Sequence, residues 1–274
     1  MSTSSSSSSS ILVAGAGGRM GRAVVAEVLR TPGVTLAGGF DRPGGPETGK
    51  DIGVLAGLDA IGLAVEENAG KGLKRAGALI DFTTPAASLA HAEASAEASV
   101  PHVIGATGFS PEEDAAIAAL AEKIAIVKSG NMSVGVNILT ALVERAAAAL
   151  PDSYDIEIFE AHHRHKVDAP SGTALMLGEA AARGRGVALD EKAAGVSELR
   201  KGARAIGDIG FSVFRGGGVV GDHEVAFAAE EEIVTLSHRA IDRALFAKGA
   251  VAAARWVIGR PPGLYTMRDV LGLT

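Results

Sequence analysis

The chain has 274 residues, with 36 glycines, no cysteine and a formal net charge of −6. The missing cysteines exclude a disulfide scaffold, a cysteine-based zinc site and a cysteine nucleophile, and the negative charge offers no overall attraction to nucleic acid or to an anionic membrane. Any anionic ligand therefore needs a local cluster of positive groups.

The chain begins with MSTSSSSSSS, which is too polar to bury a core, so we expect residues 1–10 to be a disordered serine-rich leader. No cationic segment precedes an apolar run with a cleavage site, and no apolar run approaches the roughly 18 residues that span a bilayer. We therefore expect a soluble, cytoplasmic protein with no membrane or nucleic-acid partner.

Residues 11–131 alternate short apolar runs with amphipathic stretches. The predicted strands are ILVAG (11–15), VTLAGGF (34–40), ALIDF (78–82), HVIGA (102–106) and IAIVKSG (124–130), and the predicted helices span 19–30, 86–98 and 111–123. This order predicts a Rossmann-type α/β domain, in which helices cover a doubly wound parallel sheet. Residues 45–76 are less regular and are expected to hold a loop and one peripheral strand or helix.

The pattern changes after Asn131. A predicted helix over 134–150 leads into a strand over 154–163, and a further helix opens at Ser171. Three β-like segments follow, at 209–215, 223–229 and 232–240, joined by turn signals such as RGGG. We expect residues 132–242 to form a second, α+β domain with a mixed, mainly antiparallel sheet. A last helix over 243–259 and a tail at 263–273 are expected to complete the first domain, within 243–274.

A glycine-rich turn lies between the first predicted strand and helix, in the segment ILVAGAGGRMG. Dinucleotide-binding turns need a tight turn at the first glycine, close approach of the backbone to a pyrophosphate, and a small residue where helix meets strand. Gly15, Gly18 and Gly21 satisfy these needs in a G-x-x-G-x-x-G arrangement. The helix that follows presents its N-terminal amides to the phosphates. An ordinary glycine-rich turn is the alternative interpretation.

The second predicted strand ends at Asp41, about where such folds place the acid that binds the adenosine ribose. Arg42 follows directly, and a guanidinium favours the 2′-phosphate of NADP, so the pair predicts use of NADH, NADPH or both. Two further loops, at 105–108 and 129–132, follow predicted strands at the edge where open α/β sheets bind ligands. They are expected to form the wall of a nicotinamide pocket.

The segment EAHHRHKVDAPSGTA, residues 160–174, allows three interpretations: a metal site, a basic surface loop, or an anion site with a proton donor. Strand alternation sends His163 and His165 to one face and His162 to the other, which disfavours a metal site, and we expect no bound metal. The Pro-Ser-Gly-Thr run resembles a helix start that holds an anion. His162 or Lys166 is then the natural proton source when hydride adds to a double bond.

These motifs resemble those of the 4-hydroxy-tetrahydrodipicolinate reductase (dihydrodipicolinate reductase) family. GAGGRMGR, DFTTP, GATGF, EAHHRHKVDAPSGTA, SGNMSVGVN and GLYTMRDVL are all similar to family motifs. The resemblance implies reduction of 4-hydroxy-tetrahydrodipicolinate, a small dicarboxylate, with NADH or NADPH in lysine and diaminopimelate biosynthesis. It also implies a homotetramer, whose second domain binds substrate and builds the oligomer.

The resemblance further implies roles for individual residues. His162 is the proton donor or acceptor and Lys166 is a proton donor. Substrate contacts fall on His163, Ser171, Gly172 and Thr173. Cofactor contacts fall on Gly15, Ala16, Gly17, Gly18, Arg19, Met20, Asp41, Arg42, Gly105, Ala106, Thr107, Ser129, Gly130, Asn131 and Met132.

Two residues depart from the family pattern. Many members have Glu where Asp41 stands and Phe where Met132 stands, so the reach to the ribose and one aromatic contact in the nicotinamide pocket differ here. Two other functions also fit the glycine turn and Asp41. One is an amino-acid or hydroxy-acid dehydrogenase on the same scaffold, and the other is a nucleotide-sensing regulatory protein without turnover. Only the histidine-lysine segment separates the reductase from the dehydrogenase, whereas a sensing protein would bind the cofactor tightly without oxidising it.

Overall fold

The computed structural model describes residues 9–193 and 204–273, which divide into two compact units. Residues up to Ser133, together with Ala244–Gly272, form the first unit, and Val134–Arg243 form the second. Of the serine-rich leader expected over 1–10, residues 1–8 lie outside the described residues. No helix in the described ranges is long and apolar enough to cross a membrane.

The first unit is built on a six-stranded parallel sheet with the strand order β10-β5-β4-β3-β1-β2, which confirms the predicted fold class. The strands are β1 (Ser9–Ala14), β2 (Val34–Phe40), β3 (Ala78–Asp81), β4 (His102–Ile104), β5 (Ala125–Lys128) and β10 (Gly263–Tyr265). The chain reverses its direction of travel across the sheet between β2 and β3, so the loop after β1 lies at the switch point where such sheets bind ligands.

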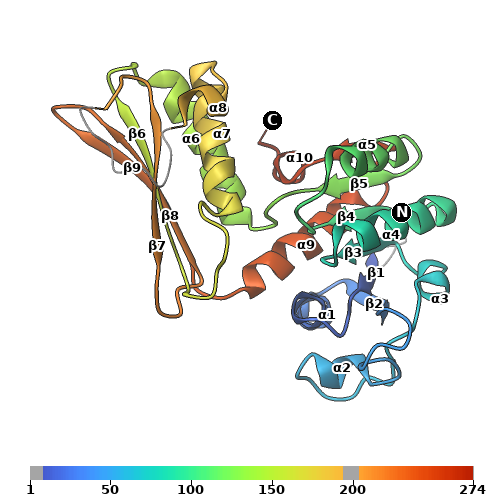
Figure 1. Cartoon of the computed structure of the whole chain (residues 1–274). Helices are drawn as coiled ribbons and strands as arrows, with labels where there is room; N and C mark the ends of the chain where they lie inside the picture. Colours follow the sequence, from blue (N-terminus) through green and yellow to red (C-terminus); the bar gives the residue numbers. More distant parts are fainter. Residues whose placement is uncertain (1–8, 194–203, 274) are drawn as a thin grey trace, which may run out of the picture. The chain divides into compact units, whose positions relative to one another are not determined.

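Helices cover both faces of this sheet (Figure 1). They are α1 (Arg19–Arg30), α2 (Ile52–Leu55), α3 (Gly70–Leu73), α4 (Pro85–Ala98), α5 (Pro111–Leu120), α9 (Ala244–Val257) and α10 (Met267–Leu271). Helices α1 and α9 pack together, and α9 lies against β3, β4 and β5, while α4 packs against α5 and β4. The apolar strand runs are buried between these layers, as their sequences predicted.

Three features of the first unit differ from the sequence predictions. Strand β1 begins at Ser9, inside the expected leader, because the backbones of Ser9 and Ser10 pair with Val34 and Thr35 and this pairing needs no apolar side chains. Residues 45–76 hold two short helices instead of one element. The C-terminal segment, expected as a tail, adds β10 beside β5.

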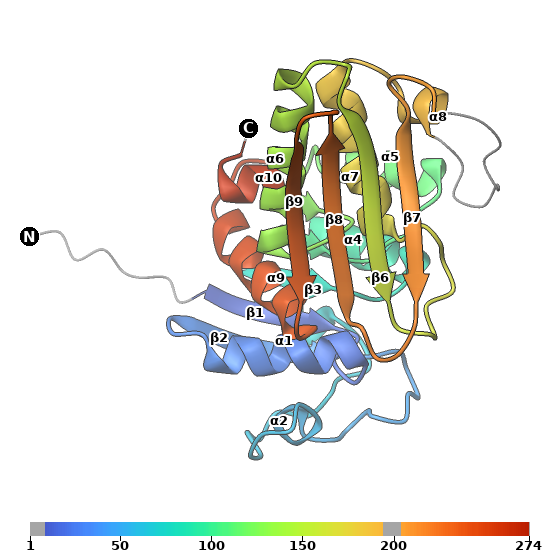
Figure 2. The same cartoon turned by 90° about the vertical axis from the view of Figure 1, so that its left-hand side faces the viewer.

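The second unit contains a four-stranded sheet with the order β7-β6-β8-β9, seen face on in Figure 2. Its strands are β6 (Asp155–His162), β7 (Ile209–Arg215), β8 (Gly221–Ala228) and β9 (Ile233–Ala240). Strand β6 runs parallel to β7 and antiparallel to β8, and β8 is antiparallel to β9, so the sheet is mixed and mainly antiparallel, as predicted.

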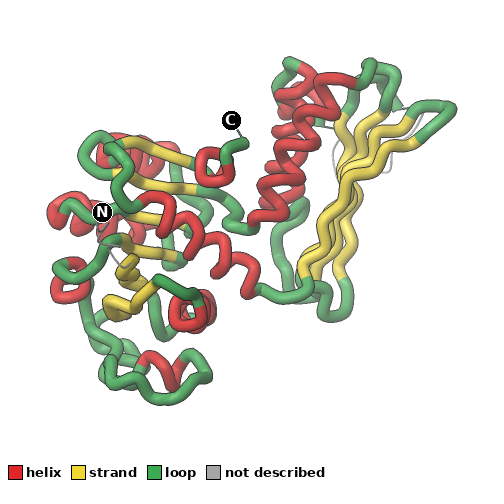
Figure 3. The backbone as a smooth tube through the Cα atoms, turned by 180° about the vertical axis from the view of Figure 1, so that it is seen from behind, coloured by secondary structure: helices red, strands yellow, loops and turns green. Residues whose placement is uncertain are grey.

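Helices α6 (Val134–Ala149) and α7 (Gly172–Arg185) pack together against one face of this sheet (Figure 3), and the short α8 (Leu189–Lys192) follows α7. The core between the layers includes Ile156, Ile158, Leu177 and Phe227. Glu160 and His162 continue the same face of β6 and are also buried. The strand alternation therefore carries two polar side chains into the helix-covered layer, next to the start of α7.

Candidate active site

The glycine-rich segment between β1 and α1 is a tight turn. Gly15 has a φ of +61°, and its carbonyl accepts a hydrogen bond from the Gly18 amide at 2.9 Å. A Cβ at Gly21 would lie 2.0 Å from the Gly15 carbonyl oxygen, so only glycine lets α1 approach the turn this closely. The turn leads directly into a helix N-terminus, whose first amides lack intrahelical partners and attract anions.

A cavity of about 1390 Å³ lies beside this turn. Its walls include Gly15, Gly17 and Gly18 from the turn, and Asp41 and Arg42 from the end of β2. One carboxylate oxygen of Asp41 accepts a hydrogen bond from the Arg42 amide at 2.8 Å, and the other lies 2.9 Å from where a Cβ at Gly17 would stand. The expected ribose acid and the expected phosphate turn therefore face one cavity.

Glu47 lines the same cavity and had no signal in the sequence, because it belongs to the irregular segment before α2. Its carboxylate pairs with Lys50 at 2.8 Å and with Arg22 at 3.1 Å, and Arg22 also donates to the Gly17 carbonyl at 2.7 Å. The hydrogen bond from Lys50 is the main cause that lowers the pKa of Glu47. A loop carboxylate is thus tied to the glycine turn through a shared arginine.

The DFTTP motif and α4 contribute further residues to the cavity wall, among them Thr83 and His91. Both are held by the buried Asp81, which accepts hydrogen bonds from the Thr83 amide at 2.7 Å and lies 2.7 Å from Nδ1 of His91. Burial alone would raise the pKa of Asp81, but interactions with His102 and His91 outweigh it and hold the pKa well below its ordinary value. The sequence indicated the motif but not His91.

The two remaining cofactor loops follow β4 and β5. The Gly105 amide donates to the Asp81 carbonyl at 2.8 Å, and the Ser129 amide donates to the Ile104 carbonyl at 3.2 Å, so each loop is tied to a neighbouring strand. In the described part of the chain, no residue of either loop lines the cavity. Of the other residues expected at the cofactor, Ala16, Ala106, Asn131 and Met132 are buried, Met20 is half-buried, and Arg19, Thr107 and Gly130 are exposed.

In the second unit, β6 ends at His162, one residue earlier than predicted. His163 begins a turn, in which the Lys166 amide donates to the His163 carbonyl at 3.1 Å. The prediction that His163 and His165 lie on one face of a strand was therefore wrong, because the strand ends before both residues. Within residues 9–193 and 204–273, no group of three or more histidine, aspartate or glutamate residues is placed to hold a metal ion.

Helix α7 begins where predicted, with Ser171 as its N-cap residue. The Ser171 hydroxyl accepts a hydrogen bond from the Ala174 amide at 3.1 Å and lies 3.0 Å from Nε2 of His223. Ser171 is only 2% exposed, so its hydroxyl is engaged within the protein. The exposed surface at the helix start belongs to Gly172, where an added Cβ would meet nothing within 4 Å, and Thr173 is half-buried.

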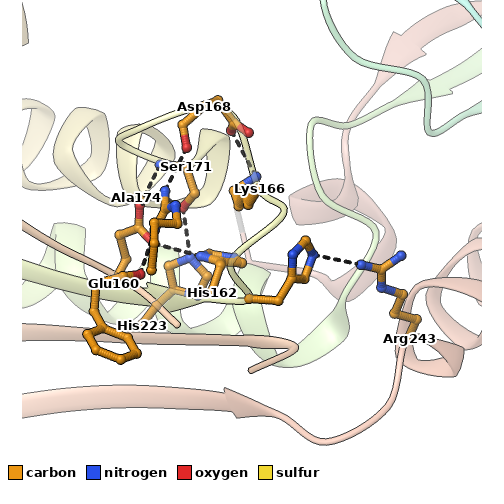
Figure 4. A network of polar contacts seen from close by, with 11 residues as sticks. Glu160, His162, Lys166, Asp168, Ser171, Ala174, His223 and Arg243 are labelled. Atoms are coloured by element: carbon orange, nitrogen blue, oxygen red, sulfur yellow. Dashed lines mark hydrogen bonds and ion pairs between the residues drawn. The ribbon is translucent and has the colours of Figure 1, made fainter. Parts of the chain in front are cut away.

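His162 is fixed by a buried carboxylate (Figure 4). Its Nδ1 lies 2.6 Å from Oε2 of Glu160, and Glu160 also accepts a hydrogen bond from the Ser171 amide at 2.9 Å. Arg215, at the end of β7, donates to both carboxylate oxygens at 2.7 Å. The ring of His223 meets the ring of His162 edge to face, with centroids 5.1 Å apart. Strands β6 and β8 therefore each supply a side chain that contacts the His162 ring, and β7 supplies the arginine that holds Glu160.

Burial and charge shift the pKa values of this group. Burial would raise the pKa of Glu160, but the hydrogen bonds from Arg215, His162 and the Ser171 amide outweigh it and lower the pKa. Burial lowers the pKa of His162, while Glu160 opposes that change and Lys166 and Arg215 add to it. Burial and the neighbouring His162 lower the pKa of His223 to about 4. His223 is therefore neutral near pH 7.

Positive side chains surround the turn that follows His162. Lys166 forms an ion pair with Asp168 at 2.8 Å, and Nη2 of Arg243 lies 3.0 Å from Nε2 of His163 (Figure 4). Nδ1 of His163 is buried and has no hydrogen-bond partner among the described residues. The turn thus carries Lys166 and His163, and Arg243 donates to Nε2 of His163, so two positive side chains, Lys166 and Arg243, lie at this end of the site, as an anion site requires.

The structure adds four residues to the site that the sequence did not single out as functional: Glu160, Arg215, His223 and Arg243. Glu160 lies within the quoted motif, and its two-residue spacing from His162 on a strand was a usable signal. Arg215 and His223 reach the site because they pair with His162 and Glu160 across the sheet. Strand pairing between distant segments is not visible in a single sequence.

Two family models match the chain almost end to end. The model described as dihydrodipicolinate reductase, N-terminus, matches residues 9–132, and the model described as dihydrodipicolinate reductase, C-terminus, matches residues 135–271. Their common boundary falls within a few residues of Ser133, where the first unit passes into the second. The matched segments include both the glycine turn and the His162 segment.

Curated relatives match over a similar length. A protein of Parvibaculum lavamentivorans named 4-hydroxy-tetrahydrodipicolinate reductase is 55% identical over 264 residues, covering 96% of this chain and 97% of the relative. A protein of the same name from Brucella abortus (strain 2308) is 51% identical over 264 residues, covering 96% and 98%. Among solved structures, the dipicolinate-bound dihydrodipicolinate reductase from Paenisporosarcina sp. TG-14 has the same fold, with a TM-score of 0.75 and 24% identity, covering 95% of this chain and 98% of that one.

Proposed function

The chain belongs to the dihydrodipicolinate reductase family, and from this membership we propose that it reduces 4-hydroxy-tetrahydrodipicolinate to tetrahydrodipicolinate with NADH or NADPH. The reaction is a step of lysine and diaminopimelate biosynthesis. The observation that carries the proposal is the second-unit site, where a carboxylate-held histidine stands beside a cationic turn and a helix start. That arrangement suits a small dicarboxylate that must receive a proton.

The residues of the first unit fit a nicotinamide dinucleotide. A Cβ at Gly17 would meet Glu47 at 2.7 Å and a carboxylate oxygen of Asp41 at 2.9 Å, so only glycine lets these two acids approach the turn so closely. Gly17 and Gly18, with the first amides of α1, would hold the pyrophosphate, and Asp41 would accept hydrogen bonds from the adenosine ribose. When bound, the reduced nicotinamide supplies the hydride. Gly105 to Thr107 and Ser129 to Met132 complete the proposed contacts.

Asp41 and Arg42 favour different cofactors. The Asp41 carboxylate suits the ribose hydroxyls of NADH, whereas the Arg42 guanidinium suits the 2′-phosphate of NADPH. Both side chains line the same cavity. We therefore expect both cofactors to support turnover.

The second unit handles the substrate and the proton. One substrate carboxylate would lie at the start of α7, over Gly172 and Thr173, where the helix N-terminus favours an anion. Lys166 and Arg243 add positive charge at this end of the site, and His163 adds its imidazole, whose Nε2 accepts a hydrogen bond from Arg243. His162 and Lys166 then exchange the proton that accompanies hydride addition to the double bond. Whichever of His162 and Lys166 gives up the proton regains one from solvent after turnover.

The homotetramer belongs to this proposal as well. The sheet face opposite α6 and α7 exposes Phe159 by 43%, Phe214 by 57% and Ile233 by 65%. Exposed apolar side chains on one sheet face favour association between subunits. Light scattering on the protein as it elutes from a size-exclusion column gives its molar mass, and the mass of a monomer would contradict the tetramer. The cytoplasmic location stays a prediction.

The reductase proposal is tested by following the absorbance of the reduced cofactor. Substrate is made freshly from pyruvate and aspartate semialdehyde, and NADH and NADPH are used in parallel. We expect both cofactors to be oxidised only when the substrate is present. Oxidation with pyruvate alone would favour a hydroxy-acid dehydrogenase. Tight cofactor binding without oxidation under any of these conditions would favour a sensing protein and overturn the proposal.

A further inference from the structure

Glu160 connects the groups of the second-unit site, because His162, Ser171 and Arg215 all lie within hydrogen-bond distance of its carboxylate. Its side chain is completely buried, and four donors surround its two oxygens. Oε1 accepts from the Ser171 amide at 2.9 Å and from Nη2 of Arg215 at 2.7 Å. Oε2 accepts from Nη1 of Arg215 at 2.7 Å and lies 2.6 Å from Nδ1 of His162. The proposed reaction gives this carboxylate no step of its own.

The four contacts determine the protonation of the histidine. An arginine guanidinium and a backbone amide can only donate, so an ionised Glu160 is the acceptor in each of these hydrogen bonds. Nδ1 of His162 must then carry a proton as well, because two acceptors at 2.6 Å would repel each other. A neutral His162 therefore carries its hydrogen on Nδ1, and Nε2 is the nitrogen that gains and loses a proton.

We propose that Glu160 is a positioning residue that fixes the ring orientation and tautomer of His162, so that Nε2 exchanges the proton with the substrate. This inference rests on the proposed function, since it assigns a partner to the proton-transferring histidine. The logic is that of a buried carboxylate that orients a general acid or base. With its side chain completely buried, Glu160 acts through His162.

Charged and titratable groups face His162 from every element packed around it. Glu160 lies on the same strand, Arg215 on β7, His223 on β8 and Lys166 in the turn that follows. Among these groups, Glu160 favours the protonated ring, while Arg215 and Lys166 disfavour it. Arg215 thus limits how far Glu160 can stabilise the imidazolium, which keeps His162 able to return its proton.

The same carboxylate also links the proton site to the anion site. Through the Ser171 amide, Glu160 holds the first residue of the α7 start, and through His162 it holds the proton-transferring ring. The two functional elements therefore share one buried anchor. A change at Glu160 should disturb proton transfer first, because Ser171 retains its own cap bond to the Ala174 amide.

A merely structural carboxylate would stabilise the fold without setting the pH dependence, so the test uses the pH profile of kcat/KM. In Glu160→Gln the loss of negative charge lowers the pKa of His162, and the alkaline limb should move to lower pH by about one unit, with kcat reduced about 10²-fold. In Arg215→Met the loss of a positive charge should move the same limb to higher pH.

The chain offers a matched control on the same strand. Glu157 accepts a hydrogen bond from Nη1 of Arg204 at 2.6 Å and from the Ser212 hydroxyl at 2.7 Å, but it has no histidine partner among the described residues. Glu157→Gln therefore removes a comparable glutamate-arginine pair from β6. It should leave the alkaline limb where the wild-type protein has it. An unchanged limb in Glu160→Gln, or an equal shift in Glu157→Gln, would overturn the proposal.

Nitrogen-15 NMR of the histidine rings in the wild-type protein gives a readout that needs neither turnover nor a stable variant. His162, assigned by its absence from the spectrum of His162→Gln, should show a protonated Nδ1 and an unprotonated Nε2 above its pKa. The opposite tautomer would contradict the role of Glu160 even if the enzyme is fully active. Absence of wild-type turnover would instead contradict the proposed function and leave the tautomer result standing.

Discussion

Replacing Ser171 with alanine should destabilise the second unit by more than the loss of a helix cap. The Ser171 hydroxyl caps α7 through the Ala174 amide, and removing such a cap costs about 1 kcal/mol. The same hydroxyl is the hydrogen-bond partner of Nε2 in His223, whose Nδ1 already has no partner in the described chain. Leaving this buried ring without any hydrogen bond costs roughly 1–3 kcal/mol more.

The expected loss for Ser171→Ala is therefore roughly 2–4 kcal/mol in the free energy of unfolding. Ser110→Ala is the matched control, because Ser110 caps α5 through the Glu113 amide at 3.2 Å within a capping box. That hydroxyl has no buried histidine to satisfy, so about 1 kcal/mol should be lost. Urea unfolding followed by circular dichroism measures both variants. Equal losses would refute the reasoning that His223 depends on Ser171.

Three further changes follow from the geometry. Gly21→Ala places a Cβ 2.0 Å from the Gly15 carbonyl oxygen, so titration with NADH or NADPH should show at least a tenfold loss of affinity, and unaltered binding would contradict the fit of turn to helix. The pKa of His223 is lowered to about 4 in the folded chain, so the unfolded chain binds more protons between about pH 6.5 and pH 4. The free energy of unfolding should therefore fall by up to about 3 kcal/mol as the pH falls through this window. A free energy of unfolding that does not change with pH there would show that the folded chain accepts a proton on His223 as readily as the unfolded chain does. Lys166→Ala and His162→Ala should each lower kcat by about 10²-fold or more, and near wild-type rates in both would refute their roles in proton transfer.

Local patterns in the sequence predicted the parts of the fold that depend on neighbouring residues. The apolar run at Ile11–Ala14, the glycine turn after it and the helix start at Ser171 are all governed by contacts within a few residues. Strand β10 was missed because its three residues, Gly263–Tyr265, pair with β5, more than a hundred residues earlier in the chain. The serines that open β1 were misjudged for the same reason, since backbone pairing with β2 holds them.

The candidate site divides in the same way. The motif around His162 indicated both the proposed proton donors and the helix start, because all of them lie in one continuous segment. Arg215 and His223 were invisible, since the pairing of β6 with β7 and β8 brings them beside Glu160. The end of β6 at His162 also depended on the fold, because the chain turns there and Gly216 donates its amide to the His162 carbonyl at 3.0 Å.

The most direct test of the central claim follows the transferred hydrogen itself. The wild-type protein is given cofactor that carries deuterium at the hydride position of the nicotinamide, together with freshly made 4-hydroxy-tetrahydrodipicolinate, and the product is analysed by mass spectrometry. We predict tetrahydrodipicolinate with one deuterium for each cofactor oxidised. Oxidised cofactor without labelled tetrahydrodipicolinate, or no oxidation at all, would contradict the assignment of this chain as a hydride-transferring reductase of that substrate.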